Sequence, residues 1–356
     1  MRSVIKNYLA MIAFAVVAVL VIGAIGVRID RDQEADPIEG ISATPAITGE
    51  TRSGLVDAQW LLGNLDQVDY ILDLGDQRQY DLGHIPNAHH IWWQDAMSAH
   101  ASNYSEPDKI SQLASGTGVF GFLNLHIPQD AHVVIYDSNG SERATWLLWV
   151  MQINGYTDVQ VLDGGLAAWI GAGGELTTDA APAVDDSIQA TPTTDTAFLV
   201  KTEGVSNAIN DGTKIIDTRD SEQMQDTVNG TTREGHIPGA INILTADVMR
   251  EDGTFKSAAD LREIFEANGI SPDDDVIVYS LFAHQSGNMW LALHIADYDN
   301  VRIYQEGYAA WGQDASLPIE TDSFQIPEPI ASPAASPVVT PVIPEPTPTE
   351  EPTDLT

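Results

Sequence analysis

The sequence contains no cysteine and few basic residues: 16 Lys and Arg stand against 52 Asp and Glu, which gives a formal net charge of −36. The absence of cysteine excludes disulfides, metal sites built on thiolates and any catalytic thiol. The scarcity of cations argues against binding to the phosphate backbone of nucleic acids, because such binding needs clustered Lys and Arg. We therefore expect no nucleic-acid partner for this acidic chain.

Length and hydrophobic content indicate a folded chain. With 356 residues, the chain has room for two domains of about 100–200 residues each. Hydrophobic residues make up 43% of it, which argues against disorder throughout. We expect two globular domains between two unusual ends.

The N-terminal end contains a long apolar run. Residues 8–27 carry no charge and follow Arg2 and Lys6, and a helix of this length spans about 30 Å, the thickness of the hydrocarbon layer of a membrane. We interpret residues 1–29 as a membrane anchor that leaves the globular part outside the cytoplasm, followed by a linker at 30–52. The alternative is a signal peptide that is cleaved on secretion, because small residues near the end of the run offer a cleavage site.

The C-terminal end is rich in proline. Residues 325–356 contain nine prolines, no Lys or Arg and no periodic apolar pattern. Such a composition cannot bury enough apolar surface to offset the conformational entropy of the chain. We expect residues 323–356 to form a disordered tail that acts as a spacer, with a ligand for a proline-binding domain as the alternative.

The rest of the chain repeats one pattern twice. Gly-His-Ile-Pro-Asn-Ala at residues 83–88 recurs as Gly-His-Ile-Pro-Gly-Ala at 235–240, and each is followed by a short apolar run and then by Ala-Ala-Trp. Landmarks that match in the same order predict two copies of one domain. We place the copies at residues 53–178 and 198–322, with a linker rich in Asp, Ala, Thr and Pro at 179–197.

The second copy alternates strand and helix patterns. Short, mostly apolar runs at residues 215–217, 276–279 and 301–304 are typical of buried strands. Ser257 is expected to cap a helix that stops at Gly269. The alternation predicts an α/β fold in which a mainly parallel sheet is flanked by helices, and ligands of such sheets bind beyond the carboxyl ends of the strands.

One segment combines the features of an anion site. Residues 279–287 leave a predicted strand, form a tight loop and enter an apolar helix. This arrangement directs several backbone N–H groups and the positive end of a helix dipole to one point. The equivalent loop of the first copy contains Asp137 and Glu142, and their carboxylates make it a poor host for an anion.

The two copies resemble the tandem rhodanese domains of thiosulfate and 3-mercaptopyruvate sulfurtransferases. In the second copy, the motifs that carry the resemblance are Asp-Thr-Arg at 217–219, Gly-His-Ile-Pro-Gly-Ala at 235–240, the strand-loop-helix segment and Gly-Tyr-Ala-Ala-Trp at 307–311. In the first copy, they are Asp-Leu-Gly at 73–75, Gly-His-Ile-Pro-Asn-Ala at 83–88 and Gly-Gly-Leu-Ala-Ala-Trp at 164–169. The resemblance covers residues 53–322 and implies two tandem rhodanese-like domains.

The resemblance also implies a site. In this family, a cysteine at the start of the second-domain loop accepts sulfur as a persulfide and passes it to a thiophile. Ser280 occupies that position here, and Asp137 occupies it in the first copy. Arg219 matches the arginine that helps to hold the anionic substrate, where the first copy has Gly75. The other candidate substrate-binding residues follow Ser280 in the loop: Leu281, Phe282, Ala283, His284, Gln285 and Ser286.

Ser280 lacks the chemistry that a persulfide relay needs. The relay requires a sulfur atom that attacks as a thiolate and then forms and releases an S–S bond. A serine hydroxyl does neither. Leu281 and Phe282 also place apolar side chains where loops of the family use Arg, Lys, Gly or Ser. This breadth of change favours natural loss over a single engineered Cys→Ser replacement.

The sequence favours neither a serine hydrolase site nor a metal site built on histidine. No Gly-x-Ser-x-Gly turn surrounds Ser280, and no carboxylate is visibly placed to orient His284, so a hydrolase is disfavoured. His84 and His236 are expected to be structural, since nothing has the spacing of metal ligands. We expect neither a metal nor a cofactor.

The sequence therefore predicts a pseudoenzyme of the rhodanese family that is retained to bind an anion or a partner. The expected partners are a small sulfur oxyanion at the Ser280 loop or a thiol-bearing molecule, besides the membrane at residues 8–27. The alternative is an active enzyme of the sulfurtransferase family that binds thiosulfate-like anions through loop N–H groups and Arg219 without an enzyme persulfide.

Overall fold

The computed structural model describes residues 54–91, 125–138, 141–183, 196–225 and 232–321. The chain divides into two compact units, Met1–Ile47 and Thr48–Thr356, and every described residue belongs to the second unit.

The predicted ends of the chain fall outside this part. Within the described residues, no helix has both the length and the apolar character needed to cross a membrane. The expected anchor at residues 8–27, the linker at 30–52 and the tail at 323–356 lie outside the described residues.

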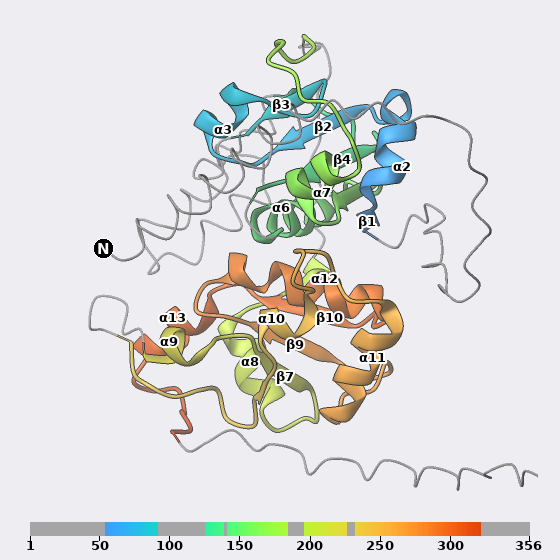
Figure 1. Cartoon of the computed structure of the whole chain (residues 1–356). Helices are drawn as coiled ribbons and strands as arrows, with labels where there is room; N and C mark the ends of the chain where they lie inside the picture. Colours follow the sequence, from blue (N-terminus) through green and yellow to red (C-terminus); the bar gives the residue numbers. More distant parts are fainter. Residues whose placement is uncertain (1–53, 92–124, 139–140, 184–195, 226–231, 322–356) are drawn as a thin grey trace, which may run out of the picture. The chain divides into compact units, whose positions relative to one another are not determined.

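The first copy is built on a sheet of five parallel strands in the order β1-β5-β4-β2-β3 (Figure 1). The strands are β1 (Leu55–Val56), β2 (Tyr70–Asp73), β3 (Ala88–His90), β4 (Val133–Tyr136) and β5 (Val159–Leu162). The helical elements are α2 (Ala58–Gly63), η1 (Leu65–Gln67), α3 (Gln77–Leu82), α6 (Glu142–Ile153) and α7 (Gly165–Gly171). β4 is buried along its whole length, as expected of a central strand that is covered on both faces.

The second copy has the same architecture, with the strand order β6-β10-β9-β7-β8, again parallel throughout. The strands are β6 (Leu199–Val200), β7 (Lys214–Asp217), β8 (Ile241–Asn242), β9 (Val276–Tyr279) and β10 (Val301–Tyr304). The helical elements are η3 (Thr196–Phe198), α8 (Thr202–Ala208), α9 (Ser221–Gln225), α10 (Thr245–Val248), α11 (Ala258–Ala267), η4 (Ala283–Ser286), α12 (Gly287–Ile295) and α13 (Gly307–Gln313). The matching strand orders confirm the predicted duplication and the α/β class.

The predicted elements of the second copy are confirmed. The three apolar runs form β7, β9 and β10. The Ser257 hydroxyl accepts a hydrogen bond of 3.2 Å from the Asp260 N–H and so caps α11. Beyond the end of α11, Gly269 adopts a φ of +72°, a left-handed conformation that glycine reaches without steric cost.

Helices α6 and α12 join the two copies. Nearly all their residues are buried, and they share one hydrophobic cluster with residues of both sheets. The Thr145 hydroxyl on α6 donates a hydrogen bond of 2.8 Å to Oδ1 of Asn288 on α12. A helix that is apolar all round must be buried on all sides. Each copy therefore supplies the cover for the other copy's helix, and the loops that follow β4 and β9 lead into these two helices.

Candidate functional site

Ser280 lies directly after β9, in the predicted strand-loop-helix arrangement. β9 ends at Tyr279, and the chain then passes through η4 into α12. The Ser280 residue is only 1% exposed, and Leu281 is 3% exposed. The position that corresponds to the family cysteine is thus buried.

The start of α13 packs against this loop and closes it. The N–H groups of Tyr308 and Ala309 donate to the carbonyl oxygens of Ser280 and Leu281, at 2.9 and 3.0 Å. A Cβ added at Gly307 would lie 2.6 Å from the Leu281 carbonyl oxygen, so only glycine permits this approach. The contact explains why the Gly-Tyr-Ala-Ala-Trp motif begins with glycine.

Among the remaining predicted loop residues, Phe282 and Gln285 are hydrogen-bonded to each other. The Phe282 N–H donates to Oε1 of Gln285 at 3.2 Å, and the Gln285 N–H donates to the Phe282 carbonyl at 3.1 Å. The Phe282 ring is stacked on His284, with centroids 5.8 Å apart. Ala283 and Ser286 are buried. At least one N–H of the predicted anion cradle is therefore already satisfied within the loop.

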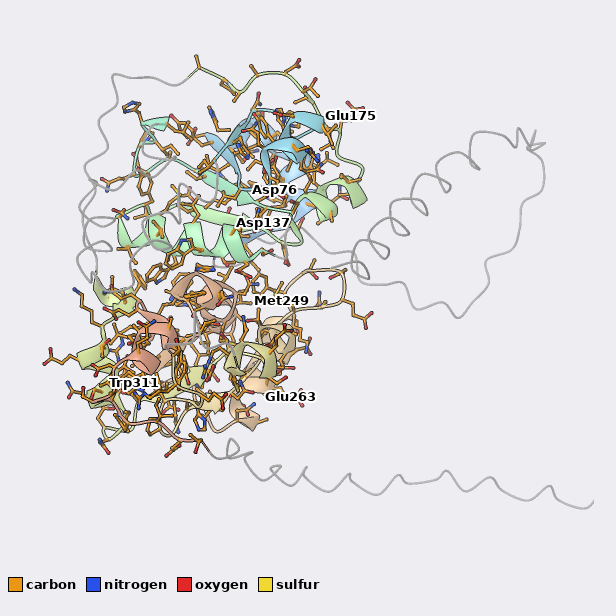
Figure 2. The ribbon with its side chains drawn as sticks, turned by 90° about the vertical axis from the view of Figure 1, so that its left-hand side faces the viewer. Asp76, Asp137, Glu175, Met249, Glu263 and Trp311 are labelled. Carbon is orange, nitrogen blue, oxygen red and sulfur yellow. The ribbon has the colours of Figure 1, made fainter. Side chains whose placement is uncertain are left out.

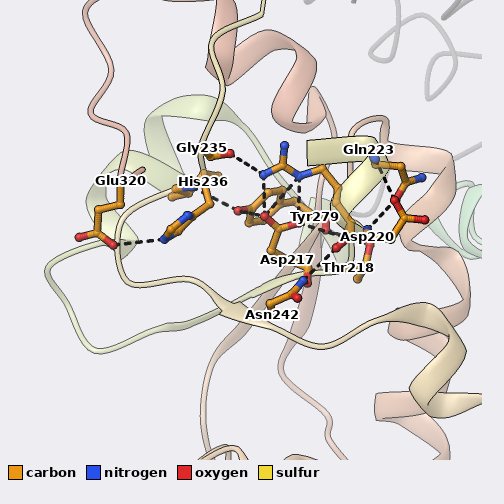
Figure 3. Close-up of polar contacts among 11 residues, drawn as sticks. Asp217, Thr218, Asp220, Gln223, Gly235, His236, Asn242, Tyr279 and Glu320 are labelled. Carbon is orange, nitrogen blue, oxygen red and sulfur yellow. Dashed lines mark hydrogen bonds and ion pairs between the residues drawn. The ribbon is translucent and has the colours of Figure 1, made fainter. Parts of the chain in front are cut away.

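Arg219 is held inside the second copy by an ion pair with Asp217, which is labelled in Figure 3. Its Nη2 donates to Oδ2 of Asp217 at 2.7 Å, its Nε donates to Oδ1 of Asp217 at 3.0 Å, and Nη2 also donates to the Gly235 carbonyl at 2.8 Å. Both side chains of the ion pair are 0% exposed. The Tyr308 ring covers the guanidinium, with 3.7 Å between its centroid and Cζ.

Charge and burial set the protonation states around this pair. Burial alone would lower the pKa of Arg219, but the hydrogen bonds and charge of Asp217 outweigh it, and the net shift is upward. Burial and the charge of Asp217 raise the pKa of Tyr279, which donates its hydroxyl proton to Oδ2 of Asp217 at 2.6 Å. At neutral pH, Arg219 is therefore charged and Tyr279 is neutral.

Three polar atoms around Arg219 lack a hydrogen-bond partner among the described residues: Arg219 Nη1, Tyr308 Oη and Thr232 Oγ1. All three are buried. The side chains of Thr232 and Tyr308 flank Gly312, where an added Cβ would meet them at 2.4 and 3.2 Å. Buried polar groups normally have a hydrogen-bond partner, so these three atoms are exceptions within the described residues.

The structure brings Arg219 and Ser280 to the same edge of the sheet. β7 and β9 are paired, with Asp217 opposite Tyr279, and the Thr218 N–H donates to the Tyr279 carbonyl at 2.9 Å. The two candidate residues therefore follow the carboxyl ends of neighbouring strands, as the sequence predicted for ligand-binding positions. Each is buried, and Arg219 is turned toward Asp217.

The histidines of the Gly-His-Ile-Pro motifs have structural contacts. The ring nitrogens of His84 lie 2.9 Å from the Tyr80 carbonyl and 3.0 Å from the Asp179 carbonyl. Nε2 of His236 lies 3.5 Å from Oε2 of Glu320. These contacts support the structural interpretation. Within the described residues, no group of three His, Asp or Glu side chains could hold a metal ion.

His284 has a carboxylate neighbour that the sequence did not indicate. Oε1 of Glu142, from the first copy, lies 3.7 Å from Nε2 of His284. The sequence showed no carboxylate placed to orient this imidazole, because the two residues meet only when α6 and α12 pack together. Glu142 is far from His284 in the sequence, so no local pattern could reveal the contact.

The corresponding loop of the first copy contains its own anion (Asp137 is labelled in Figure 2). Oδ1 of Asp137 accepts from the Ser141 N–H at 3.0 Å, and Oδ2 accepts from the N–H groups of Arg143 and Ala144, both at 2.9 Å. The carboxylate thus fills the N–H cradle at the start of α6. This geometry supports the prediction that the first loop is a poor host for an external anion.

The corresponding carboxylate of the first copy, Asp73, has no arginine beside it in the Asp-Leu-Gly motif. Gly75 stands where the second copy has Arg219, and its N–H donates to Oδ1 of Asp73 at 2.6 Å. Burial raises the pKa of Asp73, although the hydrogen bonds from Tyr136 and Gly75 oppose the shift. The first copy therefore preserves the buried carboxylate but not its countercharge.

One known domain family matches both copies. The rhodanese-like domain family matches residues 57–172 and again residues 202–314, which together make up more than half of the chain. The chain belongs to the rhodanese family. The predicted resemblance is thus confirmed, including its two tandem domains and the missing cysteine.

Similar proteins carry sulfur-related names. The chain is 29% identical to the "Sulfur carrier protein TtuD" of Thermus thermophilus over 286 residues, which cover 74% of this chain and 95% of the relative. It is 28% identical to a "Thiosulfate sulfurtransferase" of Corynebacterium glutamicum over 283 residues, or 75% and 90% of the two chains. The wild-type structure of EanB has the same fold, with a TM-score of 0.62 at 19% identity, covering 76% of this chain and 69% of EanB.

Proposed function

We propose that this rhodanese-family chain does not transfer sulfur through an enzyme persulfide and acts instead as a binding module. The observation that carries the proposal is Ser280, which follows β9 at the position of the family cysteine in a chain without any cysteine. An oxygen atom at this position cannot accept sulfane sulfur as a thiolate does.

The closed loop supports a binding role over the alternative of catalysis without a persulfide. That alternative needs a thiosulfate-like anion to reach Arg219 and the loop N–H groups. The Arg219 side chain is 0% exposed and already paired with Asp217, and the Phe282 N–H is bonded to Gln285. An anion would have to displace contacts within the protein before it could bind.

The sulfur-related names of the relatives guide the choice of partner. We propose a thiol-bearing partner before a free sulfur oxyanion, because the partner would supply the thiol that this chain lacks, and the closed loop leaves little access for an anion. We also propose that residues 8–27 anchor the chain in a membrane with the globular part outside the cytoplasm, or that they direct its secretion when cleaved.

An assay of thiosulfate:cyanide sulfur transfer tests the proposal. The full-length chain is compared with its Ser280→Cys variant and with a reaction that contains no protein. We expect the unmodified chain to match the protein-free rate, because its hydroxyl forms no persulfide. Turnover by the unmodified chain above that rate would refute the proposal.

Mass spectrometry of both proteins after incubation with thiosulfate gives a second readout. We expect no added sulfur on the unmodified chain. A sulfur adduct on the Ser280→Cys variant alone would show that the missing atom is what separates this chain from a sulfurtransferase. Calorimetric titration of the unmodified chain with thiosulfate tests the partner, since clear saturable heat would favour the oxyanion over the thiol-bearing partner.

A further inference from the structure

A cavity of about 330 Å³ lies beside the Asp137 loop of the first copy. It opens beyond the carboxyl ends of β4 and β5, between the loop that follows β4 and the start of α7. In a parallel sheet, this is the edge at which ligands bind. The volume is at the lower end of the range of small-molecule sites. Its described lining residues are Gln79, Asp137, Ser138, Ser141, Gly164, Gly165, Leu166, Ala167, Ile170, Asp252 and Gly253.

The charge of the lining excludes an anion as the ligand. The helix N-terminus at α6 would attract an anion, but the N–H groups of Ser141, Arg143 and Ala144 already donate to Asp137. None of the described lining residues is Lys, Arg or His, while Asp137 and Asp252 are both acidic. Two carboxylates without a basic neighbour in the lining favour a cation.

A buried hydroxyl in the lining has no hydrogen-bond partner among the residues that the structure describes. Ser141 is 2% exposed, and its Oγ makes no hydrogen bond with any described residue. Leaving such a group unsatisfied costs free energy, which a ligand that donates a hydrogen bond would recover. An ammonium group has three donors and no acceptor, so it matches both this oxygen and the carboxylates.

One wall of the cavity is apolar. Leu166, Ala167 and Ile170 of α7 line it, and Ile170 is 51% exposed. A ligand with a short hydrocarbon body would cover this surface. Each methylene group that it buries would strengthen binding by roughly fourfold.

We propose that this cavity binds a small organic cation, an alkylammonium group whose hydrocarbon part lies on α7 and whose charge lies near Asp137, Ser141 and Asp252. The same chemistry occurs in a free amine and in a lysine side chain of another protein. The proposal goes beyond the proposed function and does not depend on it, because the site lies beside the Asp137 loop, with Asp252 and Gly253 of the second copy in its lining, and involves no sulfur transfer.

Asp252 gives the surface variant for the test. Its carboxylate accepts from the N–H and the hydroxyl of Thr254, which lowers the pKa of Asp252 and keeps it ionised at neutral pH. Asp252→Asn removes the charge at an exposed position and retains an acceptor for Thr254. Asp66→Asn is the matched control, because it removes one exposed carboxylate that does not line the cavity.

The experiment is calorimetric titration of the full-length chain, in a nonionic detergent at pH 7, with butylammonium chloride. We expect saturable binding at one site, stronger than that of methylammonium, and no binding of butanoate. Ser141→Ala should weaken the affinity about tenfold and Asp252→Asn about threefold, while Asp66→Asn should leave it unchanged. Nα-acetyl-lysine methylamide distinguishes the source, since tighter binding than butylammonium indicates a lysine side chain.

Three results would overturn the proposal: no saturable binding of either amine, equal binding of butanoate, or affinities that do not change in both Ser141→Ala and Asp252→Asn. If Ser141→Ala does not fold, the pair Asp252→Asn and Asp66→Asn still decides the question. The sulfur-transfer assay is independent of this titration, so either proposal can fail alone.

Discussion

At the scale of single residues, two Arg–Asp ion pairs have the same length but differ in burial, so they show how burial alone affects the contribution of an ion pair to stability. The Nη2–Oδ2 distance is 2.7 Å in both Arg219–Asp217 and Arg262–Asp297. The side chains of the first pair are 0% exposed, whereas those of the second are 39% and 81% exposed. Removing one member of a buried pair leaves an uncompensated charge, while an exposed pair is screened by water.

We therefore predict different losses of stability for Arg219→Ala and Arg262→Ala. Arg219→Ala should lower the free energy of unfolding by about 3–5 kcal/mol, because Asp217 stays buried without its countercharge. Arg262→Ala should lower it by less than about 1 kcal/mol. Urea unfolding of both variants measures the difference, and similar losses would contradict a structural role for the buried pair.

Arg219 also shows which part of the site could not be predicted from the sequence. The Asp-Thr-Arg motif identified Arg219 as a candidate for holding an anion, and the structure places it at the predicted edge of the sheet. Its partner could not be predicted, because a guanidinium can turn toward a ligand or toward the carboxylate two residues earlier. In contrast, the absence of a thiol at position 280 could be predicted without a structure, because the sequence shows a serine directly after the predicted strand.

At the scale of elements, the sequence predicted those strands and helix ends that depend on neighbouring residues. The apolar runs of β7, β9 and β10 and the Ser257 cap of α11 were predictable, because each depends on neighbours in the sequence. The closure of the Ser280 loop depends on the start of α13, which is remote in sequence, and the contact of Glu142 with His284 depends on two helices from different copies.

The first-copy loop is the clearest case of an element that the sequence described only in part. Its two carboxylates predicted a poor anion site, and the structure supports this, since Asp137 fills the N–H cradle. The cavity beside the loop was not predicted. It is lined by α7 and by Asp252 of the second copy as well as by the loop, and no sequence pattern connects these segments.

At the scale of the whole molecule, residues 8–27 predict where the chain resides. We expect the full-length chain, expressed with its N-terminus intact, to sediment with membranes and to resist extraction with high salt, because an apolar segment of this length is held by the hydrocarbon layer. Deletion of residues 1–29 should move the protein to the soluble fraction. Recovery of the intact, uncleaved chain in the soluble fraction would contradict the anchor.

The packing of α6 against α12 predicts that the two copies unfold together. A Cβ added at Gly287 would lie 2.6 Å from Oγ1 of Thr145 and 2.9 Å from the backbone nitrogen of Trp146, so the helices would have to move apart. Gly287→Ala should therefore lower the free energy of unfolding by about 1–3 kcal/mol and split one cooperative transition into two.

Gly63→Ala is the matched control for this prediction. Gly63 ends α2, and nothing lies within 4 Å of an added Cβ there. The same chemical change should shift the free energy of unfolding by less than about 1 kcal/mol, because only helix propensity is altered.

Urea unfolding followed by tryptophan fluorescence reports on both copies, through Trp146 and Trp290. Equal urea midpoints for Gly287→Ala and Gly63→Ala would show that α6 and α12 do not hold the two copies together. The shared hydrophobic cluster would then contribute little to the stability of the two copies.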